Sequence, residues 1–124
     1  MSFRWESPVF ADELDRNGAL FSSRFPLHVE RAQAALFESM GFEPRDPELD
    51  HVVKELHIEF HAAFTAPGLL PVEITADRIG GTSARYGFRC GHYASGHRVI
   101  VRVGADGRPA PWSGWYRLAF EGLS

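Results

Sequence analysis

Two carboxylates, Glu13 and Asp15, lie two positions apart just before an Asn-Gly pair at Asn17 and Gly18. An apolar pattern with helical spacing begins shortly afterwards, near Phe25. This order places Asp15 in a turn ahead of a helix N-terminus, where the first backbone N–H groups have no partner inside the helix. A carboxylate can act as nucleophile or general base, and free N–H groups can stabilise an oxyanion. The segment therefore has the components of a hydrolytic site, although Asp beside Asn-Gly is also an ordinary turn residue.

The helix that must position Asp15 is predicted over residues 24–42. Its apolar residues recur at spacings of three and four, at Phe25, Val29, Ala32, Leu36 and Met40. Ser22 or Ser23 is the expected N-cap, since a serine hydroxyl can accept from the first free amides. Pro26 suits the first helical turn, and Gly41 suits the C-terminal stop.

Outside this helix the apolar pattern has a period of two residues, which is typical of β-strands. A short first strand is expected to end at Val9-Phe10, and four strands follow the helix. Their alternating apolar residues are Leu56, Ile58 and Phe60; Val72, Ile74 and Ala76; Ala84, Tyr86, Phe88 and Cys90; and Val99, Val101 and Val103. Strands joined by short turns pair antiparallel. The sequence therefore predicts an α+β fold in which one curved antiparallel sheet covers one long helix, while residues 108–124 show no clear pattern.

The composition is that of a single globular domain, expected to span residues 1–124, with 44% hydrophobic and 23% charged residues. No apolar run is long enough to cross a bilayer, and residues 1–10 lack the apolar core of a signal peptide. We therefore expect neither a membrane segment nor a leader. The lone Cys90 excludes an internal disulfide and is typical of a reducing cytoplasm. A net charge of −3 lacks the basic surplus of a nucleic-acid binder, so no such partner is expected.

Several segments, in order along the chain, resemble the hotdog-fold thioesterases, specifically the 4-hydroxybenzoyl-CoA thioesterase-like group. The segments are the acidic turn Glu13 to Phe21, the helix step Val29-Glu30-Arg31-Ala32, the strand Val53 to Phe60, the turn Ala63 to Leu70, the hairpin Arg78 to Ser83 and the last turn Asp106 to Pro111. Two positions depart from the family pattern. Glu13 replaces the usual Asp, and Ser22-Ser23 stands where aromatic or Asn residues are common.

The resemblance implies a hotdog fold and hydrolysis of an acyl-CoA or acyl-carrier-protein thioester to a free acid and a thiol. We expect no cofactor and no metal. Asp15 would be the catalytic carboxylate, either as nucleophile on the thioester carbonyl or as base for a water molecule. The backbone N–H of Ser22 would be the oxyanion donor. The substrate-binding residues implied by position are Gly18, Phe21, Phe25, Thr82 and Ser83. The family forms homodimers whose sheets join edge to edge, with sites at the interface, and often homotetramers.

Two other functions stay open for this sequence. The chain is alternatively a non-catalytic hotdog module that binds an acyl thioester or another apolar ligand, which the Ser22-Ser23 departure favours. It is otherwise an unrelated α+β binding protein in which Asp15 only stabilises a turn. A sheet that does not wrap the central helix would favour this last alternative.

Two polar sets on the predicted strands also have two interpretations. His57, Glu59 and His61 are possible zinc ligands. Because residues two apart on a strand lie about 6–7 Å apart, they make a poor tetrahedral set, and a solvated sheet face is the preferred interpretation. Four arginines alternate along the last two strands: Arg85, Arg89, Arg98 and Arg102. They either meet the phosphates of coenzyme A or belong to a solvated sheet face.

Overall fold

The structure of the protein, a computed structural model, describes residues 1–65 and 67–123. Ala66, in the expected turn over 63–70, and Ser124, the last residue of the expected domain, lie outside the described residues. The elements formed by this part of the chain are β1 (Phe3–Val9), α1 (Phe25–Ser39), β2 (His51–Phe60), β3 (Gly68–Ile79), β4 (Ser83–Cys90), β5 (Ala94–Arg102) and α2 (Gly114–Glu121). Short 3₁₀ turns are η1 (Ala11–Glu13), η2 (Ser22–Arg24) and η3 (Pro47–Leu49).

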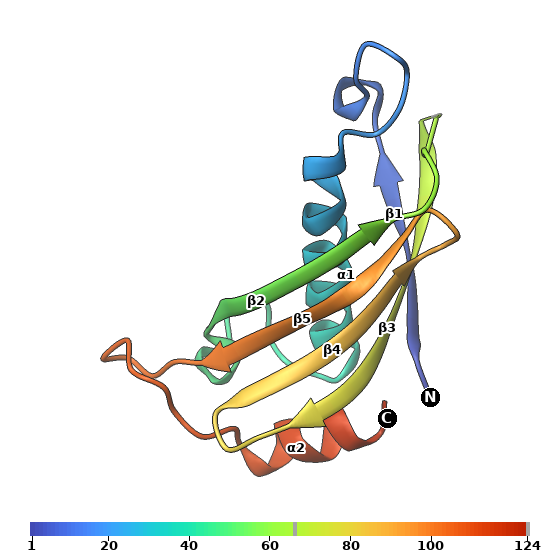
Figure 1. The fold of residues 1–124 in the computed structure, drawn as a ribbon. Helices are drawn as coiled ribbons and strands as arrows, with labels where there is room; N and C mark the ends of the chain where they lie inside the picture. Colours follow the sequence, from blue (N-terminus) through green and yellow to red (C-terminus); the bar gives the residue numbers. More distant parts are fainter. Residues whose placement is uncertain (66, 124) are drawn as a thin grey trace.

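The strands form one antiparallel sheet with the order β1-β3-β4-β5-β2. The sheet curves around α1, which lies against one face, while α2 lies at the end of the sheet near the β3–β4 turn (Figure 1). The predicted α+β arrangement, one long helix wrapped by a curved antiparallel sheet, is therefore confirmed. Neither described helix is long and apolar enough to cross a membrane.

The core lies between α1 and the inner face of the sheet. Val29, Ala32 and Leu36 of α1 are each at most 1% exposed. The predicted alternation holds on β3 and β4, where the inward residues include Val72, Ile74, Ala84, Tyr86, Phe88 and Cys90. Each large apolar side chain buried in this way stabilises the fold by about 1.5–3 kcal/mol. Burial also raises the pKa of the Cys90 thiol to about 12.

Three local predictions are wrong in detail. Ser22 and Ser23 are not the N-cap of α1, because they form η2, and the helix follows directly from Arg24 without a side-chain cap bond. The helix ends at Ser39 rather than at residue 42, although Gly41 has the left-handed φ of +90° expected of a stop.

On β5, the face that points to the core is the opposite of the one that the row of valines in the sequence suggests. Ile100 and Arg98 point to the core at 0% and 3% exposure, and the valines lie half-buried on the other face. An arginine faces inward here because α1 offers it polar partners, which strand periodicity alone does not reveal.

The second helix, α2, was not predicted. Ser113 caps it, with its hydroxyl accepting from the Tyr116 amide at 3.1 Å. Tyr116 and Phe120 are buried, and the Tyr116 hydroxyl is hydrogen-bonded to that of Tyr86 on β4. The Arg117 guanidinium donates to the Gly80 carbonyl at 2.8 Å. These contacts fix α2 to the end of the sheet.

A prediction concerns Gly96, where β5 approaches β2. A Cβ at this position would lie 1.9 Å from the His57 carbonyl oxygen and 3.0 Å from the Ile58 Cα. Both are backbone atoms, so neither can move without disturbing the β5–β2 pairing. Gly96→Ala is therefore expected to lower the free energy of unfolding by about 3 kcal/mol, the upper part of the range for overpacking. Urea denaturation of the variant and of the wild type measures this loss of stability.

The matched control is Gly87→Ala on the neighbouring strand β4, where a Cβ meets no atom closer than 4.0 Å. It should change the free energy of unfolding by less than about 1 kcal/mol. Equal losses in the two variants would contradict the steric argument.

Candidate active site

The loop between η1 and η2 holds Asp15 in a hydrogen-bonded turn. Asp15 Oδ1 accepts from the backbone N–H of Asn17 at 2.8 Å and of Ala19 at 3.1 Å. The Gly18 amide donates to the Asp15 carbonyl at 3.0 Å, and its φ of +78° suits glycine. No described residue bonds to the second carboxylate oxygen, Oδ2. Asp15 is half-buried, so one oxygen is fixed by the turn and the other is free for chemistry.

A buried polar network lies behind this turn. Glu13 is 4% exposed, and its Oε1 lies 2.8 Å from His28 Nε2 while its Oε2 accepts from the Phe10 amide at 2.9 Å. The other ring nitrogen, His28 Nδ1, is hydrogen-bonded to Ser7 Oγ. Ser7 and His28 are both 0% exposed. The network therefore joins β1, the loop that holds Asp15, and α1.

The chemistry of the partners fixes one proton in this network. A carboxylate only accepts, so His28 Nε2 carries the hydrogen that it donates to Glu13. Burial acts to raise the pKa of Glu13, but the hydrogen bonds from Phe10 and His28 outweigh it and hold that pKa below its ordinary value. The Glu13 carbonyl also accepts from the Phe21 amide at 3.1 Å. Glu13 therefore closes the loop on which Asp15 lies.

The other predicted residues of this loop lie beside Asp15 in the chain. Ser22 is the first residue of η2 and is exposed, and its amide has no acceptor among the described residues. Phe21 is 45% exposed, whereas Phe25 is buried and its ring meets that of Phe60 at 5.5 Å between centroids. The Leu20 amide donates to the Phe64 carbonyl at 2.8 Å, which attaches the loop to the segment just after β2.

Thr82 and Ser83 lie elsewhere in the protomer. Thr82 lies in the β3–β4 turn, and Ser83 is the first residue of β4. The Thr82 carbonyl accepts from the Arg102 amide at 2.8 Å, and the Ser83 carbonyl accepts from Trp112 Nε1 at 3.0 Å. This turn lies near α2, at the opposite end of the molecule from the loop between β1 and α1 (Figure 1). A single protomer therefore does not bring these two residues to Asp15, and their role in substrate binding stays a prediction.

The arginines and histidines of the strands have mixed environments. Arg98 is buried against α1, where Glu30 accepts from its Nη2 at 3.1 Å. On the outer face, His97 Nε2 lies 2.7 Å from a Glu55 oxygen and the His97 ring stacks on His57. Within residues 1–65 and 67–123 no group of three or more His, Cys, Asp or Glu side chains is placed to hold a metal ion.

Sequence reasoning missed the two polar residues of α1 that organise this region. His28 and Gln33 share the helix stripe of Phe25, Val29, and Leu36, and the spacing alone places them at the buried face. A polar residue on such a stripe requires a hydrogen-bond partner. The partners come from distant strands and the acidic loop, which no local pattern identifies.

No protein-family model and no curated protein matches this sequence. Solved structures, in contrast, do match the structure of this chain. A 1,4-dihydroxy-2-naphthoyl-CoA thioesterase from Synechocystis is 16% identical, with 99% of this chain and 98% of that chain covered and a TM-score of 0.86. A Thermus thermophilus thioesterase complexed with coenzyme A and Zn is 22% identical, with 97% and 92% covered and a TM-score of 0.84.

A candidate thioesterase from Pseudomonas aeruginosa is 24% identical, with 96% of this chain and 98% of that chain covered and a TM-score of 0.86. Likeness of this kind, over nearly the full length of each chain, establishes the hotdog fold of this protein. Because the sequence identities are this low, these neighbours show a shared fold and nothing further about the chain.

The buried network generates a prediction for Glu13→Gln. The variant amide cannot accept from both Phe10 and His28, so the free energy of unfolding should fall by about 2 kcal/mol near neutral pH. Because the folded pKa of Glu13 is depressed, its contribution is complete above the unfolded pKa and is lost as pH falls through the folded one. The difference between wild type and variant should therefore shrink as pH falls below about 4.5, the ordinary pKa of a Glu carboxyl.

Urea denaturation at a series of pH values measures this difference. Asp12→Asn is the control, since Asp12 is an exposed acid one residue away in the same 3₁₀ turn. A constant difference between wild type and Glu13→Gln at all pH values would show that Glu13 does not titrate in this way.

Proposed function

We propose that this protein is a thioesterase that hydrolyses an acyl-CoA or acyl-carrier-protein thioester to a free acid and a thiol. The observation that carries the proposal is the Asp15 turn. Two amides hold one carboxylate oxygen, while the other oxygen and the Ser22 amide, which begins the 3₁₀ turn that leads into α1, have no partner among the described residues. The hotdog neighbours support it, since one is a 1,4-dihydroxy-2-naphthoyl-CoA thioesterase and another is a thioesterase complexed with coenzyme A.

Two reaction routes use the same groups. In the first, Asp15 Oδ2 attacks the thioester carbonyl carbon, the C–S bond breaks to release the thiolate, and water then hydrolyses the resulting anhydride. In the second, Oδ2 takes a proton from a water molecule whose oxygen attacks the carbonyl, and the proton passes to the leaving thiolate. In both, the Ser22 amide donates to the oxyanion that forms on the carbonyl oxygen. The half-exposed Phe21 beside this loop is proposed to contact the acyl group.

The ordered segments favour the 4-hydroxybenzoyl-CoA thioesterase-like group as the subgroup of this chain. A single domain is proposed, because α1, α2 and all of the described strands share one hydrophobic core. The lone and buried Cys90 supports a reducing, cytoplasmic location.

A homodimer is part of this proposal, and β2 is its interface. Strand β2 lies at the edge of the sheet, and among the described strands it pairs only with β5. Val53, Leu56 and Phe60 are among its inward residues, since they pair with Ile100, Arg98 and Ala94 of the inner face. They are nevertheless 44%, 42% and 50% exposed. A second copy that adds its own β2 antiparallel to this edge would satisfy the free backbone groups and cover the apolar row.

This dimer would complete the site. The Leu20–Phe64 hydrogen bond attaches the Asp15 loop to the segment after β2, and antiparallel pairing sets the end of one β2 beside the start of the other. At that start, His51 pairs with Arg102, whose amide donates to the Thr82 carbonyl. The Asp15 loop of one protomer would therefore face the Thr82 region of its partner. The predicted substrate-binding residues, separated within a protomer, come together in this way.

The non-catalytic alternative keeps the fold and the loop but predicts binding without turnover. The third interpretation, an unrelated α+β binding protein, loses its support because the sheet does wrap α1.

The role of Asp15 is tested with Asp15→Asn. Asparagine forms the same turn, since its side-chain oxygen can accept from the Asn17 and Ala19 amides. The substitution removes only the reactive carboxylate oxygen. We expect kcat to fall by about 100-fold or more, with a thermal unfolding midpoint within about 2 °C of wild type. A thiol-release assay with aryl-CoA and fatty-acyl-CoA thioesters measures turnover.

Asp12→Asn is the matched control and should retain wild-type turnover. Unchanged turnover in Asp15→Asn would refute the assignment of Asp15. Tight thioester binding by the wild type without hydrolysis of any member of the panel would favour the non-catalytic module.

The interface is tested with Leu56→Glu. A charge in the apolar row of β2 should convert a dimer or tetramer to a smaller species, because an unpaired carboxylate would be buried at the interface. Sedimentation velocity measures the change. Leu118→Glu is the control, since Leu118 is 72% exposed on α2, which lies at the end of the sheet near the β3–β4 turn (Figure 1), and should leave the mass unchanged. A wild-type monomer, or an unaltered mass for Leu56→Glu, would refute this interface.

A further inference from the structure

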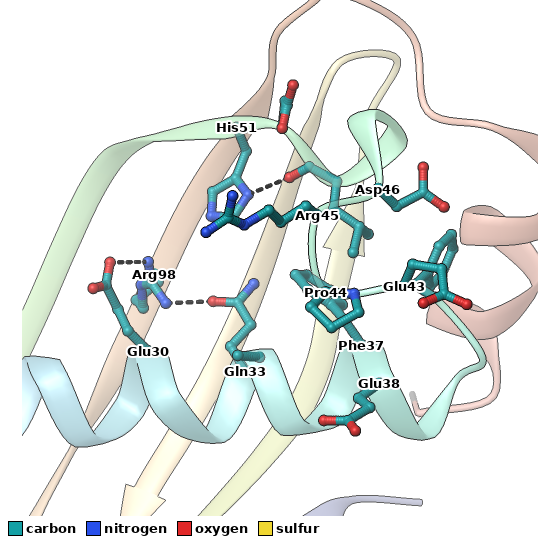
Figure 2. A pocket seen from close by; sticks show the side chains of 14 residues that line it. Glu30, Gln33, Phe37, Glu38, Glu43, Pro44, Arg45, Asp46, His51 and Arg98 are labelled. Carbon is teal, nitrogen blue, oxygen red and sulfur yellow. Dashed lines mark hydrogen bonds and ion pairs between the residues drawn. The ribbon is translucent and has the colours of Figure 1, made fainter.

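A cavity of about 460 Å³ opens between α1, the 42–51 segment and β5. Figure 2 shows its walls. Gln33 and Glu30 reach from α1 toward Arg98 on one side, and His51 and Arg45 lie on the other. Phe37, Phe42 and Leu49 supply apolar surface. The volume falls in the range of small-molecule sites.

Gln33 has a fixed orientation in this cavity. Arg98 is a donor only, so the Gln33 oxygen must face it, and Gln33 Oε1 does accept from Arg98 Nη1. The amide nitrogen, Nε2, therefore points away from Arg98. Gln33 is 3% exposed, and its Nε2 is buried without a hydrogen-bond partner within the described part of the chain. A buried donor left unpaired costs about 1–3 kcal/mol, so an acceptor from outside the chain would be stabilising here.

Charge decides which acceptor suits the site. Among the described residues that line the cavity, five are carboxylates and two are arginines: Glu30, Glu38, Glu43, Asp46 and Asp50, with Arg45 and Arg98. The charge of Arg98 is already balanced by Glu30. An anionic ligand would therefore be repelled, whereas an uncharged oxygen would not be.

We propose that this cavity binds an uncharged apolar group that carries an acceptor oxygen, a ketone or a hydroxyl, and that Gln33 Nε2 donates to this oxygen. The apolar body of the group packs on Phe37, Phe42 and Leu49. In the dimer proposed above, the cavity lies beside the start of β2 and faces the partner's Asp15 loop. If the thioesterase proposal holds, the group is the distal end of the acyl chain, and this last step rests on that proposed function.

The first experiment measures binding directly and does not depend on catalysis. Three probes of similar shape are compared: acetophenone, with a neutral carbonyl; isopropylbenzene, with no acceptor; and benzoate, with an anionic one. The readout is the pair of side-chain N–H₂ resonances of Gln33 in two-dimensional NMR spectra of the 124-residue chain. Acetophenone should shift these resonances and bind about 10-fold more tightly than either other probe.

Gln33→Glu tests the contribution of the Gln33 N–H₂ donor separately from that of the other residues that line the cavity. The variant keeps an oxygen for Arg98 but replaces the N–H₂ group by a second oxygen, which repels a carbonyl. Acetophenone binding, followed on backbone resonances of the 42–51 segment, should weaken by about 10-fold or more. Ala34→Leu fills the cavity from an exposed position on α1 and should weaken all three probes while the protein stays folded.

Equal binding of acetophenone and isopropylbenzene, no shift of the Gln33 resonances, or unchanged acetophenone binding by Gln33→Glu would each overturn the proposal. A second arm separates it from the proposed activity. Acetophenone should inhibit thioester hydrolysis competitively in wild type and about 10-fold less in Gln33→Glu. If acetophenone binds without inhibiting hydrolysis, the cavity is a ligand site but does not hold the acyl chain. If the protein hydrolyses no thioester but still binds acetophenone, the result contradicts only the proposed thioesterase activity.

Discussion

The fold depends on one geometric constraint: a single helix is narrower than the sheet against which it packs. An α-helix with its side chains is about 10–12 Å across, while neighbouring strands lie about 4.8 Å apart, so a single helix covers two or three strands. Here α1 packs on β1, β3 and β4. The helix reaches β5 through the Gln33–Arg98 hydrogen bond and β2 through the Phe25–Phe60 ring contact, but it covers the inner face of β2 only in part. The cavity beside Gln33 and the exposed apolar row of β2 both follow from this constraint, because both lie where the helix covers the sheet incompletely.

Polar groups placed within the apolar stripe of α1 give the fold its specificity. His28 bonds to Ser7 and Glu13 near the start of the helix, and Gln33 bonds to Arg98 near its middle. A buried polar group is costly unless it is paired, so each contact favours one register of the helix against the sheet. The first network also holds the acidic loop against β1. In this way the helix that fills the core also determines where the Asp15 carboxylate lies.

The sequence reveals those features that follow from local periodicity. The alternation on β3 and β4, the spacing on α1 and the Gly41 stop all depend on neighbours along the chain, and they agree with the structure. The inward Arg98, the buried His28 and the missed α2 depend on partners far along the chain. No periodic pattern distinguishes an arginine paired with a helix from one on a solvated face. The position of Asp15 in a turn was predictable from Asn17-Gly18, whereas the partners of Glu13 required the tertiary structure.

The burial of Cys90 has a consequence for a protein proposed to handle acyl thioesters. An exposed thiolate would exchange with such substrates and leave the chain acylated on sulfur. Cys90 is inaccessible at the end of β4, and with a pKa of about 12 its thiol stays protonated at neutral pH. The chain therefore presents no competing sulfur nucleophile among its described residues, and self-acylation by transthioesterification is suppressed by packing alone.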